Sequence, residues 1–198
     1  MKFPDNVEEL RKLEPDFMGM IFYEKSSRNV GESLEPANIK GLNQPKKIGV
    51  FVNADKDFML QKVEDFGLDY LQLHGQESVQ MCKDLTESGV GIIKVFSVGN
   101  GFDFDILKDY EPFVDFFLFD TKGKHPGGNG VVFNWEILDQ YPSSIPFFLS
   151  GGISLENAGA IPKHPKLYAI DVNSKFEISP GLKNIEQLTD LKKQLASA

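Results

Sequence analysis

The chain has 198 residues, of which 41% are apolar and 12% aromatic, enough to bury one large core. Its formal net charge of −8 argues against a nucleic-acid partner, because such binding needs a basic surface. No apolar run approaches the roughly 20 residues that cross a bilayer. The single Cys82 excludes an internal disulfide and favours a reduced, cytoplasmic setting. We expect one domain over residues 1–198, with no membrane and no nucleic acid as partner.

Helix and strand patterns alternate along the chain, beginning with a helix whose Val7, Leu10 and Leu13 share one face. Seven apolar runs then predict strands, at residues 16–23, 47–53, 70–75, 92–97, 116–120, 146–152 and 168–174. Helical patterns fall between these strands, near residues 36–42, 60–66, 79–85 and 106–107. Two more begin at about residue 134 and after residue 154, and a last helix covers residues 184–195. The prediction is seven strands and eight helices.

Strict alternation of this kind indicates right-handed βαβ units and a parallel sheet. Eight helices favour an α/β fold of the (β/α)8 TIM barrel type, which has ~250 residues as a rule and ~200 in small cases. A doubly wound open sheet is the rival, but no Gly-rich dinucleotide turn follows the first predicted strand. The pattern lacks a strand ahead of the first helix. We therefore predict a TIM barrel whose strand 1 is missing from this chain.

The clearest functional signal is the aromatic run 116–119, which ends abruptly in Asp120 and a Gly- and Lys-rich loop. Such a run is typical of a strand buried on both faces, and the loop would let backbone and cations approach an anion. A plain capping role is the alternative for Asp120. Strand C-termini converge on one face of a barrel, so other polar residues at strand ends are expected beside it: Arg28, Asn53, Gln72, His74, Asn173 and Ser174.

A phosphate site is predicted at the last two strand ends. Gly151 and Gly152 precede a predicted helix start, and Asn173 and Ser174 precede Lys175. In barrels, backbone N–H groups and a helix N-terminus at this place hold phosphate. Glycine pairs alone are weak support, since most are simple turns. No Cys/His cluster has zinc spacing, so we expect no metal.

Five segments in this order resemble phosphoribosylanthranilate isomerases, the barrel enzymes of tryptophan biosynthesis: residues 19–28, 49–53, 72–75, Asp120 with 127–130, and 150–152, followed by the tail 171–183. The resemblance runs from about Asp16 to the C-terminus. It implies an Amadori rearrangement of N-(5-phosphoribosyl)anthranilate to 1-(2-carboxyphenylamino)-1-deoxyribulose 5-phosphate. It also implies a small phosphorylated substrate as partner and no cofactor.

The same resemblance implies roles for individual residues. Asp120 would be the general acid that protonates the ribose ring oxygen, and Arg28 would engage the anthranilate carboxylate. The other implied substrate residues are Gln72, His74, Gly127 and Gly128, and the phosphate residues are Gly151, Gly152, Asn173 and Ser174.

The family's general base is a cysteine in a Lys-x-Cys-Gly segment at the end of the first strand, and this sequence has no such segment. Cys82 falls on a helix of the outer ring and is expected to be a buried packing residue. We therefore expect impaired turnover. A phosphate-sugar-binding or interaction protein without turnover is the alternative. Indole-glycerol-phosphate synthase is a weaker one, since it needs a Lys and Glu pair that the sequence does not place. Open edges at the missing strand would also allow a homodimer.

Overall fold

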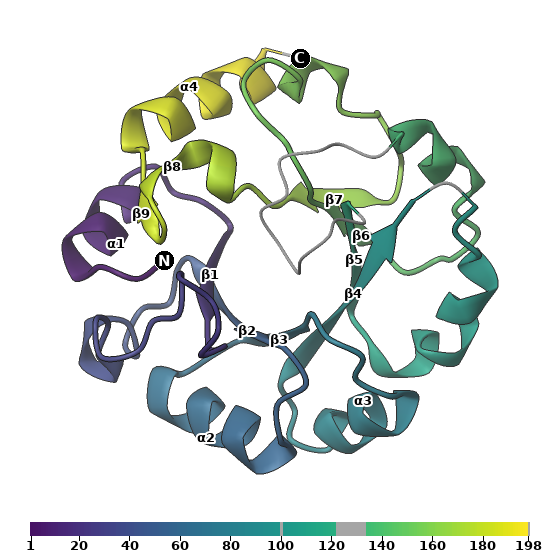
Figure 1. The fold of residues 1–198 in the computed structure, drawn as a ribbon, viewed down its shortest axis with the longest axis horizontal. Coiled ribbons are helices and arrows are strands. Elements are labelled where there is room, and N and C mark those ends of the chain that lie inside the picture. The colour runs from purple at the N-terminus through teal and green to yellow at the C-terminus, as the bar shows by residue number, and fades with distance from the viewer. Residues whose placement is uncertain (100, 122–133, 198) are drawn as a thin grey trace.

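A computed structural model describes residues 1–99, 101–121 and 134–197. Its centre is one seven-stranded parallel sheet in the order β1-β2-β3-β4-β5-β6-β7, curved round an axis with the helices outside it (Figure 1). The strands are β1 (Phe17–Ile21), β2 (Lys46–Phe51), β3 (Tyr70–Leu73), β4 (Gly91–Val98), β5 (Phe116–Thr121), β6 (Phe147–Leu149) and β7 (Leu167–Ile170). All seven predicted strands are confirmed.

Helical segments occupy every predicted helix position, but half of them are short 3-10 helices. The α-helices are α1 (Pro4–Arg11), α2 (Lys56–Phe66), α3 (Val79–Thr86) and α4 (Ile185–Ala196). The 3-10 helices are η1 (Pro36–Asn38), η2 (Phe104–Asp109), η3 (Glu111–Phe113), η4 (Trp135–Gln140), η5 (Ala158–Ala160) and η6 (Ser174–Phe176). The predicted count of eight helices is therefore not confirmed, because the described residues form four α-helices and six 3-10 helices. Pro142 and Pro162 follow η4 and η5 closely and cannot continue a helix.

The two outer strands of the sheet, β1 and β7, do not pair with each other within the described residues. Near this edge lies the antiparallel hairpin of β8 (Glu177–Ser179) and β9 (Leu182–Lys183) (Figure 1). The Asn6 side chain of α1 bonds both the N–H and the carbonyl of Lys183, which ties α1 to β9. The Met1 amino group donates to the carbonyl of Gly19 on β1. In the described chain, no helix is both long and apolar enough to cross a membrane.

Alternation along the strands decides which side chains face the inside of the curved sheet. On β5, Phe116 and Leu118 belong to an inner apolar cluster, whereas Phe117 and Phe119 join the larger core shared with the helices. Successive side chains of a strand point to opposite faces, so Asp120 falls on the inner face. The apolar residues of β5 therefore determine where its carboxyl group points.

Replacing Phe117 with alanine should lower the free energy of unfolding by about 3–5 kcal/mol, because this side chain is fully buried and its loss leaves a cavity. Urea unfolding followed by circular dichroism measures the change. Phe58→Ala is the control, since that ring is 44% exposed and should cost far less. Equal losses in the two variants would contradict the described core.

Candidate active site

A cavity of about 590 Å³ extends along the inside of the sheet, from Phe17 at the start of β1 to the C-terminal ends of the strands. Eight of the residues predicted from the sequence line it: Arg28, Gln72, His74, Asp120, Gly151, Gly152, Asn173 and Ser174. Gly127 and Gly128 lie outside the described residues. The structure thus brings together residues from the ends of four strands and from the loop after β1, while their individual roles stay predictions.

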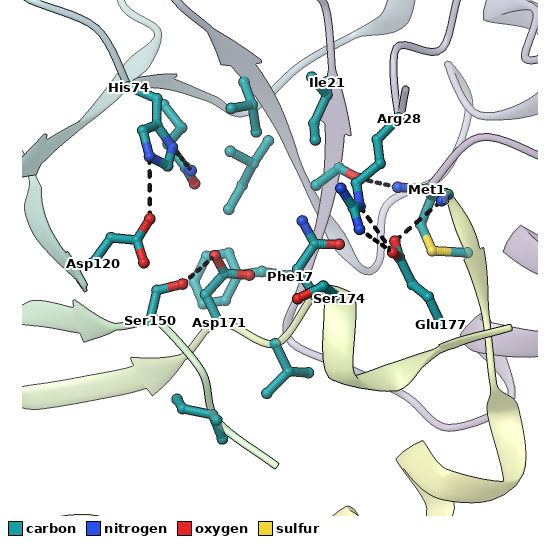
Figure 2. Close-up of a pocket in the computed structure, with 18 of the residues that line it drawn as sticks. Met1, Phe17, Ile21, Arg28, His74, Asp120, Ser150, Asp171, Ser174 and Glu177 are labelled. Atoms are coloured by element: carbon teal, nitrogen blue, oxygen red, sulfur yellow. Dashed lines mark hydrogen bonds and ion pairs between the residues drawn. The ribbon is translucent and has the colours of Figure 1, made fainter. Parts of the chain in front are cut away.

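Asp120 faces His74 at the ends of β5 and β3, on one side of the cavity (Figure 2). His74 Nε2 lies 3.3 Å from Asp120 Oδ2, and the other carboxyl oxygen accepts a hydrogen bond from the N–H of Thr121. A methyl group at Gly151 would stand 2.8 Å from Asp120 Oδ1. Glycine at this position therefore leaves the carboxyl its room. The result is a fixed carboxyl beside an imidazole, a pair suited to proton transfer.

Arg28 forms an ion pair with Glu177 on the opposite side (Figure 2). Its Nε and Nη2 lie 2.8 and 2.7 Å from one carboxyl oxygen of Glu177. The other oxygen lies 3.3 Å from Lys183 Nζ. Burial opposes the ionisation of Glu177, but the hydrogen bond from Arg28 and the charge of Lys183 hold its pKa below the usual range. Among the described residues Arg28 Nη1 has no partner, so it can still donate to an anion in the cavity.

A second carboxyl, Asp171, lies between these two groups (Figure 2). Sequence reasoning did not single it out. Ser150 Oγ donates a 3.1 Å hydrogen bond to Asp171 Oδ2. Burial raises the pKa of Asp171, the charge of Lys183 opposes that rise, and Asp120 adds to it. The signal was present in the sequence: Ala169 packs on the inner cluster, and the residue two positions later on the same strand face is Asp171.

Free backbone donors line the cavity beside these carboxyls. No hydrogen bond between described residues uses the N–H of Gly151, Gly152, Asn173 or Ser174 as donor. The helix expected after residue 154 is reduced in this described segment to the three-residue η5, which follows a turn. Unpaired N–H groups in a concave wall suit an oxyanion such as phosphate.

The single thiol lies away from this cavity. Cys82 is fully buried on α3, as the sequence predicts, and burial raises the pKa of its thiol to about 11. No thiol lines the cavity in the part of the chain that the structure describes. The described residues contain no cluster of three or more His, Cys, Asp and Glu side chains that could hold a metal ion.

A buried ion pair organises the loops after β2 and β3. Lys94 Nζ lies 2.9 Å from Glu77 Oε2 and also donates to the carbonyls of Leu73 and Gly75. Glu77 Oε1 accepts from the N–H groups of Asn53 and Gly75. Neither Lys94 nor Glu77 is more than 5% exposed. The pair therefore fixes the loop that carries His74. Asn53 accepts a hydrogen bond from the N–H of Gln76 in this loop and does not line the cavity.

Comparison with known proteins gives consistent matches. Residues 3–194 match the family described as N-(5'phosphoribosyl)anthranilate (PRA) isomerase. A protein of Parabacteroides distasonis named N-(5'-phosphoribosyl)anthranilate isomerase is 44% identical. The match covers 98% of this chain and 90% of the relative. One of the same name from Phocaeicola vulgatus is 40% identical, covering 93% of this chain and 89% of the relative.

Solved structures agree with these sequence matches. Phosphoribosyl anthranilate isomerase from Thermotoga maritima superposes with a TM-score of 0.83 at 25% identity, over 100% of this chain and 96% of its own. A phosphoribosyl anthranilate isomerase in complex with reduced 1-(O-carboxyphenylamino)-1-deoxyribulose 5-phosphate has a TM-score of 0.80 at 25% identity, with the same coverage.

Replacing Lys94 with methionine should lower the free energy of unfolding by about 3–5 kcal/mol, because Glu77 would be left as an unpaired buried charge. Urea unfolding measures the loss. The double variant Lys94→Met with Glu77→Leu removes both charges and should recover part of it. If the second substitution lowers the free energy of unfolding by as much again as the first, the two charges do not act as a pair.

Proposed function

The chain belongs to the N-(5'-phosphoribosyl)anthranilate isomerase family, and from this we propose that its cavity converts N-(5-phosphoribosyl)anthranilate to 1-(2-carboxyphenylamino)-1-deoxyribulose 5-phosphate. The main support in the fold is the pairing of Asp120 with His74, whose Oδ2 and Nε2 atoms lie 3.3 Å apart. The same cavity is lined by the Arg28 guanidinium group and by free N–H donors. A cavity that combines a proton-transfer pair, an arginine and free N–H donors matches a substrate that carries a carboxylate and a phosphate.

The substrate's two anionic groups have separate partners in this proposal. The phosphate meets the free N–H groups of Gly151, Gly152, Asn173 and Ser174. The anthranilate carboxylate meets Nη1 of Arg28, whose orientation is fixed by Glu177. Charge-assisted hydrogen bonds of this kind offset the repulsion expected from a chain of net charge −8.

In the proposed reaction, Asp120 donates a proton to the ribose ring oxygen, and the ring opens to an iminium ion. His74 lies against the same carboxyl, so it can hold Asp120 in place and return a proton to it. Removal of the C2 proton then gives an enolamine, which becomes the ketose. Gln72 orients the imidazole, since its Nε2 lies 3.5 Å from His74 Nδ1.

We also propose that the fold is a (β/α)8 barrel. The seven strands would correspond to strands two to eight of a (β/α)8 barrel, with the place of its first strand between β1 and β7. The continuous order β1 to β7 supports this, as does the absence of pairing between the two outer strands in the described chain. Unpaired edges of this kind would allow a homodimer. We propose a cytoplasmic setting, because the substrate is a biosynthetic phosphate ester.

A binding protein without turnover is the second candidate. One observation favours it: among the described residues no thiol lines the cavity, and the family resemblance implies a cysteine base. Such a protein would bind reduced 1-(O-carboxyphenylamino)-1-deoxyribulose 5-phosphate but would not consume N-(5-phosphoribosyl)anthranilate. Binding alone does not distinguish the two candidates, whereas substrate consumption does.

Replacing Asp120 with asparagine should reduce kcat about 10²- to 10⁴-fold, because the variant cannot donate a proton to the ring oxygen. The affinity for reduced 1-(O-carboxyphenylamino)-1-deoxyribulose 5-phosphate should stay within a few-fold. The decrease in substrate fluorescence gives kcat, and calorimetry gives the affinity. The control is Asp139→Asn on the exposed face of η4. Full activity of the Asp120 variant would refute the proposed acid.

Replacing Arg28 with methionine should raise KM roughly 10- to 100-fold, the loss expected when a charged hydrogen-bond donor is removed. Steady-state kinetics measures KM. Inhibition by ribose 5-phosphate is the internal control, since this sugar carries no anthranilate carboxylate and should bind the variant nearly as well. An equal loss of affinity for both molecules would assign Arg28 to the phosphate end instead.

A further inference from the structure

We propose that Lys94 and Glu77 are positioning residues for the reaction, which hold the His74 imidazole against the proton-donating carboxyl of Asp120. This inference rests on the proposed function and deepens it. Neither Lys94 nor Glu77 is among the described residues that line the cavity. An effect of this ion pair on turnover must therefore pass through residues that do line the cavity.

Lys94 holds the backbone on both sides of His74. Its Nζ donates to the carbonyl of Leu73 at 3.1 Å and to that of Gly75 at 2.9 Å, and these two residues flank the histidine. The N–H of His74 itself donates to the carbonyl of Phe51 on β2, at 2.8 Å. Backbone groups before, at and after the histidine are thus fixed, which leaves the imidazole only its own side-chain torsions.

Glu77 completes this grip and ties it to the end of β2. Both of its carboxyl oxygens accept from the N–H of Gly75, at 3.1 and 3.0 Å, and Oε1 also accepts from the N–H of Asn53 at 2.8 Å. A methyl group at Gly75 would stand 2.7 Å from the backbone nitrogen of Asn53. The loop that carries His74 is therefore packed closely against Asn53, with no space to move toward it.

Both charges are anchored in regular structure outside this loop. Lys94 lies within β4, and its neighbour Ile93 belongs to the inner apolar cluster, so the lysine side chain points to the outer core. Glu77 directly precedes Ser78, the N-cap of α3, and its carbonyl accepts from the Tyr110 hydroxyl at 3.1 Å. A reactive side chain on a loop keeps its geometry when the residues that support it are themselves locked. Burial and these bonds lock Lys94 and Glu77.

The position of the imidazole matters because it contacts the proposed acid. His74 Nε2 lies 3.3 Å from Asp120 Oδ2, and the two side chains face each other (Figure 2). A shift of about 1 Å would break a contact of this length and can cost ~10²-fold in rate. A buried ion pair gains little stability over an apolar pair of the same volume. Precise placement of His74 is the gain that the contacts of Lys94 and Glu77 indicate.

The first experiment compares Lys94→Met with Lys47→Met, under conditions in which circular dichroism shows both variants to be folded. Lys47 is the matched control, because it is also buried and pairs with Asp69 at 3.7 Å, but it lies at the opposite end of the sheet. We expect Lys94→Met to lower kcat about 10- to 100-fold, while the Kd of reduced 1-(O-carboxyphenylamino)-1-deoxyribulose 5-phosphate stays within about five-fold. Lys47→Met should leave kcat nearly unchanged. An equal fall in kcat in both variants, or no fall in Lys94→Met, would overturn the proposal.

A double-mutant cycle shows whether the effect passes through His74. In a His74→Asn background, Lys94→Met should change kcat by only about two-fold, because no imidazole is left to misplace. The same large fall in both backgrounds would make the role of the ion pair purely structural and overturn the proposal. A His74→Asn chain that keeps full activity would also overturn it.

A second variant displaces the loop without removing a charge. Gly75→Ala places a methyl group against the backbone of Asn53 and should lower kcat about 10-fold or more, with ligand affinity retained. Gly41→Ala is its control, since a methyl group there meets no atom of the described residues within 4 Å. Unchanged kcat in Gly75→Ala would contradict the positioning role.

An unchanged chain that does not consume the substrate would refute the proposed function, and the positioning role is then read without activity. The ¹H–¹⁵N spectrum of the imidazole groups reports the surroundings of His74. Its resonances should shift in Lys94→Met and in Gly75→Ala but stay in place in Lys47→Met. Resonances of His74 that do not move in Lys94→Met would overturn the positioning role, whatever the activity of the chain.

Discussion

The site depends on the alternation of side chains along parallel strands, which aims every second residue at the inside of the curved sheet. The inner apolar cluster holds Phe116 and Leu118 on β5, with Ala169 of β7 packed against it, so the residues that continue each face are Asp120 and Asp171. A shift of one residue in either strand would turn its carboxyl into the outer core. The same packing that stabilises the sheet therefore selects which groups can act on a ligand.

Electrostatic compensation at the site follows from this arrangement. A chain of net charge −8 places three carboxyls in one cavity, those of Asp120, Asp171 and Glu177, and cationic side chains beside them offset part of this charge. Lys183 and Arg28 both form ion pairs with Glu177. The Asn6 side chain of α1 holds the backbone of Lys183 by a hydrogen bond to its carbonyl. Lys94 and Glu77 neutralise each other beneath the loop that carries His74. The positive groups are held by structure, so the cavity can receive an anion without large rearrangement.

Much of the fold could be predicted from the sequence, because apolar runs of strand length and the carboxylate after residues 116–119 are strong local signals. The eight helix positions were also visible, but four of them are 3-10 helices, since prolines such as Pro142 and Pro162 limit their length. Asp171 was missed although the alternation of side chains along its strand points to it, whereas Glu177 and Lys183 were missed as a pair. Their importance comes from contacts between residues far apart in sequence, such as Arg28 with Glu177 across 149 positions. Local pattern carries no information on such pairs.

The most direct test is whether the unchanged 198-residue chain consumes N-(5-phosphoribosyl)anthranilate, followed by the loss of its fluorescence. The account predicts turnover that saturates with substrate and is inhibited by reduced 1-(O-carboxyphenylamino)-1-deoxyribulose 5-phosphate. A chain that binds this inhibitor tightly but leaves the substrate unconsumed would contradict it. The protein would then be a binding protein on the fold of an isomerase.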